Sequence, residues 1–297
     1  MLNAKIKIRK ENDRALRNSG VGATVTTVIA YIIFASYTLL LLFILGWGFL
    51  QSLKENREFF RDMLALPQKW LFSNYITAFG KLQYNGVTFA GMLLNSLWFS
   101  VGMTLISVFM HCVTGYIFAK YDFKGKAAAF AFILLTLAVP VVGTLPSQYK
   151  VITTLRFNES PLFLITSLGG FGSNFLITYA FFKGIDKAYM EAAQIDGAND
   201  LYIFLRIMLP LASAPFAALS ILGIIMQWNN YETPLLFLTK LPTLASGLYN
   251  FREVVKYESN ETVYLASAFI TMIPIMLLVT VFGNKIMTSM AVGGIKG

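Results

Sequence analysis

Long apolar runs alternate with short polar segments along the whole chain. The first run, residues 21–50, contains no charged residue, and five more uncharged runs follow at about 91–119, 127–146, 161–182, 211–231 and 263–284. A helix needs about 20 mostly apolar residues to cross the hydrocarbon core of a bilayer. The pattern therefore predicts an all-α membrane protein with six transmembrane helices.

The composition argues against a soluble protein. Of the 297 residues, 56% are hydrophobic and 13% are charged, whereas an average soluble domain is about 25% charged. The chain has one cysteine, Cys112, and one histidine, His111. One residue of each kind rules out an internal disulfide framework, a multi-cysteine zinc site and a cluster of imidazole ligands. No bound metal or cofactor is expected.

A basic arm, residues 1–20, precedes the first apolar run. Its basic side chains are Lys5, Lys7, Arg9, Lys10, Arg14 and Arg17. A basic segment just before a membrane helix is typical of the cytoplasmic side, so nucleic acid is not expected as a partner. The run 21–50 is longer than the apolar core of a signal peptide and ends without a small-x-small cleavage site. It therefore predicts a retained helix.

The distribution of positive charge predicts the orientation. With the N-terminus inside, the inner segments carry 14 basic residues and the outer segments carry 10, which is the expected bias. Both termini and the segment 183–210 are then cytoplasmic, and residues 1–297 form a single membrane domain. The largest outer segment, 51–90, is expected to lie along the outer surface, with Trp70 at the level of the lipid headgroups.

Several apolar runs contain helix-interrupting residues. They are Pro140, Pro215, Pro274 and the sequence GGFGS at 169–173. Such breaks are tolerated where neighbouring helices satisfy the freed backbone groups. Two explanations are open: the breaks are kinks that serve helix packing, or they line a transport pathway with irregular backbone.

One inner segment is unusually polar and contains the sequence EAAQIDGANDLYIFLRIMLP at 191–210. Asp186 is placed to cap a helix of good helix formers that ends before Gly197, because glycine readily takes the positive φ of a helix-ending turn. Asn199 or Asp200 can start a second helix. The segment therefore predicts a short polar helix–turn–helix between two membrane helices. This chemistry alone also fits a plain connector at the membrane surface.

The spacing within this segment resembles the cytoplasmic EAA loop of permease subunits in binding-protein-dependent ABC importers. The matching positions, which show no gap, are Glu191, Ala192, Ala193, Gly197, Ile207, Leu209 and Pro210. Further matches, to the MalG-type sugar permeases, extend over nearly all of the chain after Val21. They are Ser52-Leu53-Lys54, Glu58-Phe59, Pro67, Trp70, Asn74-Tyr75, Asn95-Ser96-Leu97, Ala119 to Lys126, Trp228-Asn229 and Gly293 to Gly297.

The resemblance implies a fold and a mechanism. The fold is that of a type I ABC importer permease, in which the EAA loop, here 183–210, is a coupling helix docked in a cleft of a separate ATP-binding subunit. Glu191 would form the ion pair with that subunit, and Gly197 would form the turn. ATP and Mg²⁺ would be bound by the partner, and this chain would be a transport subunit without catalytic residues.

The resemblance also implies partners and a location. The partners are a MalF-like second permease subunit, two ATP-binding cassette subunits, an extracytoplasmic solute-binding protein, a saccharide substrate and membrane lipid. The location is the bacterial cytoplasmic (inner) membrane, which the chain would cross several times.

Two features that the sequence lacks agree with a transporter whose energy source lies outside the bilayer. The GxxxxG at Gly86 and Gly91 is followed by Met92, so it is not a P-loop, and no other candidate P-loop occurs. No Asp, Glu, Lys or Arg lies within a predicted span, although proton-coupled carriers usually need one. The main alternative is an ion-coupled carrier or channel, and a sodium-coupled carrier could use backbone carbonyls at a broken helix.

A second alternative is an intramembrane enzyme. Ser107 and His111 lie four residues apart on one helix face, as a nucleophile and its base could. No third orienting group or oxyanion hole accompanies them. A histidine that packs or hydrogen-bonds between helices explains the same residues.

The densest polar and aromatic cluster lies at the outer end of the fifth run. Its members, the candidates for a saccharide pathway, are Trp228, Asn229, Asn230, Tyr231 and Glu232. An interfacial aromatic belt explains them equally well. Ser173, Asn174 and Thr271 are weaker candidates. Glu232 would repel an acidic sugar whereas Arg252 or Lys256 would attract it, so the charge of the substrate stays open.

Overall fold

The computed structural model describes residues 2–139, 143–258 and 260–294, with side chains for 24–139, 143–253 and 260–282. These residues form helices and loops without a β-strand, apart from an isolated bridge between Tyr84 and Val87. Pro140 and the end of the terminal motif, 295–297, lie outside the described residues. So do the side chains of the basic arm and of Lys256. The chain divides into two compact units, Met1–Phe72 and Ser73–Gly297.

Unit 1 is built on the long helix α1 (Leu2–Ser52). Within it, Thr24–Ser52 is long and apolar enough to cross a membrane, as the first apolar run predicted. The short α2 (Asn56–Arg61) follows. The chain then returns to the end of α1, where Trp47 donates a hydrogen bond from Nε1 to the carbonyl of Met63 (2.8 Å).

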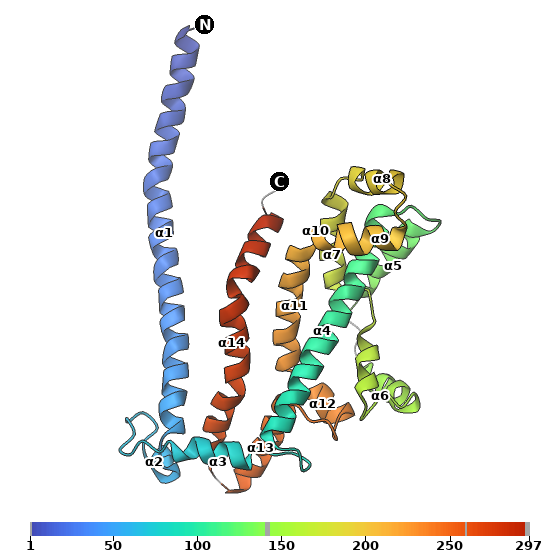
Figure 1. The fold of residues 1–297 in the computed structure, drawn as a ribbon. Helices are drawn as coiled ribbons and strands as arrows, with labels where there is room; N and C mark the ends of the chain where they lie inside the picture. The colour runs from blue at the N-terminus through green and yellow to red at the C-terminus, as the bar shows by residue number, and fades with distance from the viewer. Residues whose placement is uncertain (1, 140–142, 259, 295–297) are drawn as a thin grey trace. The chain divides into compact units, whose positions relative to one another are not determined.

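Unit 2 contains the remaining helices, and Figure 1 shows their arrangement. They are α3 (Ser73–Lys81), α4 (Phe89–Lys120), α5 (Lys126–Ala138), α6 (Leu145–Thr154), a 3₁₀ helix (Pro161–Ser167), α7 (Ser173–Gly184), α8 (Ala188–Ile195), α9 (Asp200–Ile203), a π-helical turn (Phe204–Met208), α10 (Leu209–Leu211), α11 (Ser213–Trp228), α12 (Glu232–Phe237), α13 (Leu244–Glu258) and α14 (Glu261–Gly294). In Figure 1, α8 and α9 lie at one end of α4, and α12 and α13 lie at the other. We call these the hairpin end and the far end.

The predicted spans are formed to different degrees. In the described residues, α4 and the segment Glu261–Phe282 of α14 are long and apolar enough to cross a membrane. The helices Asp200–Leu211 and Ser213–Trp228 form a further candidate that is bent by 75° at the residue between them. The predicted runs 127–146 and 161–182 instead form shorter helices.

The reasons for these shorter helices are local. In the first of the two runs, the 13-residue α5 ends at Ala138, and α6 begins at Leu145. The second is divided by the glycine-rich stretch 169–172 into a 3₁₀ helix and α7, as GGFGS predicted. Proline acts differently from the expectation, because α14 continues through Pro274. Pro215 lies in the first turn of α11, where a missing backbone N–H leaves no helical hydrogen bond unmade.

The core of unit 2 forms around α4, which packs against α7 and α11. A Cβ on Gly115 of α4 would lie 2.9 Å from the backbone nitrogen of Tyr179 on α7, and a Cβ on Gly223 of α11 would lie 2.6 Å from Cγ2 of Thr104 on α4. Small residues at such positions let membrane helices approach closely. The helix that reaches from the hairpin end to the far end is therefore held tightly on two sides.

Candidate functional site: the polar hairpin and the far-end cavity

The predicted helix–turn–helix is present at the hairpin end. The carboxylate of Asp186 accepts the N–H of Ala188 (3.0 Å) at the start of α8, as expected of a capping residue. At the end of α8, Gly197 has φ +82°. Its N–H donates to the carbonyl of Gln194, and the N–H of Ala198 donates to the carbonyl of Ala193. This is a Schellman motif, which requires a left-handed residue at the turn.

The second half of the hairpin begins where the sequence predicted. The side chain of Asn199 accepts the N–H of Tyr202 (2.8 Å) and caps α9. A π-helical turn and α10 continue the chain as far as Leu211. Leu209 and Pro210 lie in α10, and the sharp bend follows it.

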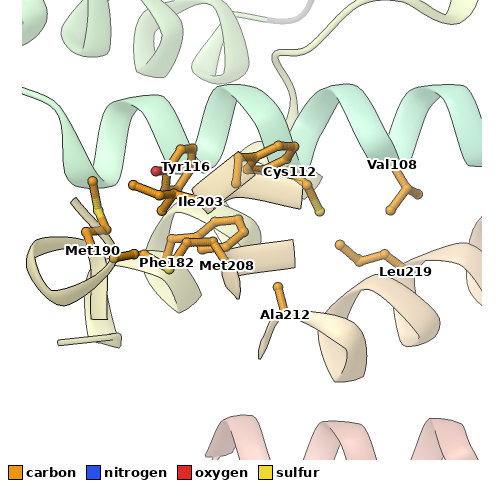
Figure 2. Packing of buried hydrophobic residues seen from close by; sticks show 11 residues of the cluster. Val108, Cys112, Tyr116, Phe182, Met190, Ile203, Met208, Ala212 and Leu219 are labelled. Carbon is orange, nitrogen blue, oxygen red and sulfur yellow. The ribbon is translucent and has the colours of Figure 1, made fainter. Parts of the chain in front are cut away.

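One face of the hairpin is buried against the membrane helices. Met190 and Ala193 of α8, with Ile203 and Met208 of the second half, contact side chains of α4, α7 and α11, and Figure 2 shows this cluster. Ile207 and Leu209 pack against the same cluster. Burial of these side chains couples the position of the hairpin to the helices beneath it, because core packing resists a change of shape.

The opposite face of the hairpin is exposed. Glu191 and Ala192 are exposed, whereas Ala193 belongs to the buried cluster. The small side chain of Ala193 therefore lets α8 approach the helices of this chain, and Ala192 is the alanine that is open to another surface. Large apolar side chains lie among the exposed ones: Ile195 is 86% exposed and Leu201 is 66% exposed. Exposed apolar side chains with a polar surround are typical of a protein-binding surface.

The loop after α4 is linked to the hairpin by hydrogen bonds. The hydroxyl of Tyr121 donates to Oδ1 of Asp200 (2.9 Å), and the hydroxyls of Tyr116 and Tyr121 lie 3.2 Å apart. Burial, followed by the hydrogen bonds with Tyr116 and Asp200, raises the pKa of Tyr121. The phenol therefore stays protonated at neutral pH and remains a donor. Lys120 adds a hydrogen bond from Nζ to the carbonyl of Ile185.

Asp122, in the same loop, contacts two lysines. Its carboxylate lies 2.9 Å from Nζ of Lys126 and 4.0 Å from Nζ of Lys187, the residue before α8. The hydrogen bond from Lys126 is the main reason why the pKa of Asp122 lies below its usual value. The sequence match over residues 119–126 thus corresponds to the connection between α4 and the hairpin.

Of the five pathway candidates at the far end, two have structural roles. Trp228 is buried in the core of unit 2. The side-chain amide of Asn230 donates to Gln227 (3.1 Å) and to Thr233 (3.0 Å), so it stabilises the turn between α11 and α12.

The other three candidates, Asn229, Tyr231 and Glu232, are exposed. Asn229 and Tyr231 line a cavity of about 560 Å³ between the end of α11, α13 and α14, and Trp228 and Thr271 line it too. Ser173 and Asn174 begin α7, and they are not among the residues that line this cavity.

Sequence reasoning missed most of this cavity. Tyr249, Arg252 and Glu253 of α13 and Tyr264 of α14 also line it. Arg252 had been noted only for its charge. The two tyrosines are far in sequence from the Trp228-Asn229 motif, and only the aromatic content of 244–264 could have drawn attention to them.

Two hydrogen bonds hold the far-end loop that leads into α13. Asn95 donates from Nδ2 to the carbonyl of Pro242 (3.0 Å), and the N–H of Leu244 donates to Oγ of Ser96 (2.7 Å). The Asn95-Ser96 pair noted in the sequence thus connects the start of α4 to the start of α13. These bonds fix one wall of the cavity.

Ser107 and His111 do not form an activated pair. Nδ1 of His111 lies 2.6 Å from the carbonyl oxygen of Ser107 and 3.4 Å from its hydroxyl. The ring is buried. This geometry fits the alternative in which the histidine packs and hydrogen-bonds within the helix bundle.

The helical arrangement, with apolar spans joined by a polar hairpin, is that of a multi-pass membrane transport subunit. A family model described as "Binding-protein-dependent transport system inner membrane component" matches residues 111–290. This chain belongs to that family, so the resemblance seen in the sequence is confirmed.

Individual relatives support the assignment. The chain is 29% identical over 255 residues to the arabinooligosaccharides transport system permease protein AraQ of Halalkalibacterium halodurans. This match covers 84% of this chain and 88% of AraQ. The chain is also 29% identical over 245 residues to the sn-glycerol-3-phosphate transport system permease protein UgpE of Pectobacterium atrosepticum. This match covers 81% of this chain and 87% of UgpE.

A solved structure shares the fold. It belongs to a bacterial ABC transporter involved in the import of the acidic polysaccharide alginate, and it matches with a TM-score of 0.71 at 22% identity. The match covers 88% of this chain and 96% of that chain. The prediction of a type I ABC importer permease fold is therefore confirmed.

Proposed function

We propose that this chain is a membrane-spanning permease subunit of an ATP-driven importer of saccharides, and that its hairpin, residues 183–210, docks on a separate ATPase subunit. One observation carries the proposal. The hairpin exposes Glu191 and Ile195 on one face and buries Met190 and Ile203 among the membrane helices on the other. A segment with these two faces can receive motion from a partner and pass it to the bundle.

The predicted role of each coupling residue follows from its position. Glu191 would pair with a cation of the ATPase, as an exposed carboxylate can. Gly197 would keep the turn in its left-handed form. Ile207, Leu209 and Ala193 would keep the hairpin seated on the cluster beneath it.

The remaining partners and the orientation belong to the same proposal. ATP and Mg²⁺ would bind to the ATPase, and a second permease chain and an extracytoplasmic solute-binding protein would complete the importer in the bacterial inner membrane. Figure 1 places the end of α14 at the hairpin end of unit 2, which supports a cytoplasmic C-terminus. The shorter helices α5 and α7, with the irregular segments beside them, would complete the six crossings.

The saccharide would pass the far end on its way into the membrane. Asn229, Tyr231 and Glu232 are exposed there, and Asn229 and Tyr231 line the 560 Å³ cavity. The relative AraQ is named for arabinooligosaccharides, which supports an oligosaccharide as the transported class.

Transport by the assembled complex tests the proposal. The complex is purified through a tag on this chain and reconstituted with a solute-binding protein into liposomes. Uptake of labelled oligosaccharides is then followed with ATP inside, without ATP, and with an imposed sodium gradient instead. We expect accumulation only with ATP. Accumulation driven by the sodium gradient alone would favour the ion-coupled carrier.

A further inference from the structure

The far-end cavity has the composition of a carbohydrate site. Its volume, about 560 Å³, lies within the range of about 300–1,000 Å³ that is typical of small-molecule sites. The rings of Tyr231 and Tyr249 stack on each other with centroids 4.7 Å apart and an angle of 9° between their planes. Both side chains are partly exposed, at 38% and 46%. In this stacked pair each ring covers one face of the other, so the flat apolar surface left for a sugar ring is an outer face of the pair.

Polar groups surround this aromatic surface. The guanidinium of Arg252 lies 5.6 Å from the centre of the Tyr264 ring, and this cation–π contact limits its freedom. Asn229, at the end of α11, and Thr271 of α14 also line the cavity. Nδ2 of Asn229 donates to the carbonyl of Ile225 (2.8 Å) and Oγ1 of Thr271 donates to the carbonyl of Ala268 (2.8 Å), so their side-chain oxygens remain as acceptors. Planar guanidinium and amide groups can each bond two neighbouring hydroxyls. The site therefore combines a ring face, a guanidinium donor and polar acceptors contributed by separate helices.

The charges of this region select among ligands. Among the described residues, Arg252 and Glu253 are the charged residues that line the 560 Å³ cavity. Glu232 lines an adjacent hollow of about 440 Å³, which shares Asn229 and Tyr231 with the first. Two carboxylates and one guanidinium give the combined surface no excess of positive charge. The described lining side chains therefore offer an anionic ligand no net attraction, and an uncharged ligand needs none.

We propose that this cavity is a binding site for an uncharged saccharide in transit, with Tyr231 and Tyr249 as its stacking surface and Arg252 as its principal hydrogen-bond donor. The assignment rests on the transport function proposed above. It places a substrate site on this chain, and it excludes sugar acids and sugar phosphates as preferred ligands.

Site-directed thiol labelling gives a direct test. The chain has a single cysteine, Cys112, which is buried, so the wild-type protein provides the unlabelled background. Ala245→Cys places a thiol in the cavity wall. Val151→Cys places one in a separate far-end cavity, which serves as the matched control. The complete tagged complex, in nanodiscs, is treated with a hydrophilic maleimide with and without sugar.

The sugars are short neutral oligosaccharides of glucose, arabinose, xylose and N-acetylglucosamine, together with oligogalacturonates. Uptake of the same sugars by wild-type complex is measured in parallel. At ten times the Kd of a transported neutral sugar, labelling of Ala245→Cys is expected to slow about tenfold, because only the free site reacts. Labelling of Val151→Cys should not change.

A second variant tests the stacking surface. Tyr249→Ala in the Ala245→Cys background should raise the sugar concentration for half-protection roughly three- to tenfold. Tyr149→Ala is the control, because Tyr149 is 49% exposed and does not line the cavity. If Ala245→Cys does not assemble, Leu248→Cys takes its place in the same wall.

The outcomes separate the two proposals. The proposed saccharide site is supported if a neutral sugar slows labelling at residue 245 but not at residue 151, and if Tyr249→Ala weakens this protection. If a transported sugar protects neither position, or both alike, the site is overturned and the transport function stands. Stronger protection by oligogalacturonates overturns the assignment to an uncharged ligand. A wild-type complex that transports none of these sugars overturns the proposed function itself.

Discussion

The hydroxyl of Tyr121, in the loop that follows α4, donates a hydrogen bond to the carboxylate of Asp200 at the start of α9, across 2.9 Å. The two residues are 79 positions apart in the sequence. This bond connects a helix that reaches the far end with the hairpin that is proposed to contact the ATPase. A shift of the hairpin would therefore act directly on the end of α4.

Removal of this bond should weaken coupling. Tyr121→Phe and Asp200→Ala are each expected to cost about 1 kcal/mol, which corresponds to a roughly fivefold loss of saccharide uptake per ATP hydrolysed. Since both variants break the same bond, the double variant should be little worse than either single one. Uptake and ATP hydrolysis by the purified complex measure this. Losses that multiply in the double variant would mean that the two side chains act separately.

Gly197 should tolerate some residues and not others. No atom lies within 4 Å of a Cβ added there, but φ is +82°, so the cost of substitution is backbone strain. A β-branched residue in this conformation costs about 1–2 kcal/mol, whereas asparagine visits it more readily. Gly197→Val is therefore expected to reduce uptake by about tenfold, with Gly197→Asn close to wild type. Equal activity of the two, at equal membrane levels, would contradict the importance of the turn.

Glu191 is expected to act through its charge. Glu191→Ala should leave membrane insertion intact because the side chain is exposed, while loss of one partner of a desolvated ion pair costs about 2–5 kcal/mol. Uptake and sugar-stimulated ATP hydrolysis should fall at least about tenfold. Gln194→Ala, at an exposed position on the same helix, is the control. Normal transport by Glu191→Ala would show that this carboxylate is not the coupling contact.

Gly115 should be required for stability. A methyl group there would lie 2.9 Å from the backbone nitrogen of Tyr179 and would also overlap the hydroxyl of Thr178. Overpacking of this kind typically costs about 1–3 kcal/mol, so Gly115→Ala should lower the thermal unfolding temperature of the detergent-purified protein by several degrees. Gly80→Ala, in α3 with no atom within 4 Å of its Cβ, should not lower it. An unchanged Tm for Gly115→Ala would mean that α4 and α7 are less closely packed.

Local sequence signals predicted the hairpin well. Asp186, Gly197 and Asn199 act through contacts within a few residues of themselves, so their capping and turn roles can be read without the rest of the fold. The glycine-rich break at 169–173 is local in the same way. Pro274 shows the limit of such signals, because its effect depends on the neighbours of α14.

The far-end cavity could not be predicted, because it depends on long-range packing. Tyr231 and Tyr249 stack although they lie on either side of α12. The link between Tyr121 and Asp200 needed the structure for the same reason, even though both residues lie in segments that sequence analysis had selected. What a sequence pattern shows is which segments matter; which of their side chains meet is decided by how distant helices pack.

Photo-crosslinking from the hairpin tests the central claim most directly. A photoreactive amino acid replaces Ile195, which is 86% exposed, and in a matched protein it replaces Tyr149 near the far end. After irradiation of native membranes, the captured chains are identified by mass spectrometry. We expect residue 195 to capture a P-loop ATPase that residue 149 does not capture. Assembled complexes in which residue 195 captures no nucleotide-binding subunit would contradict the coupling role of the hairpin.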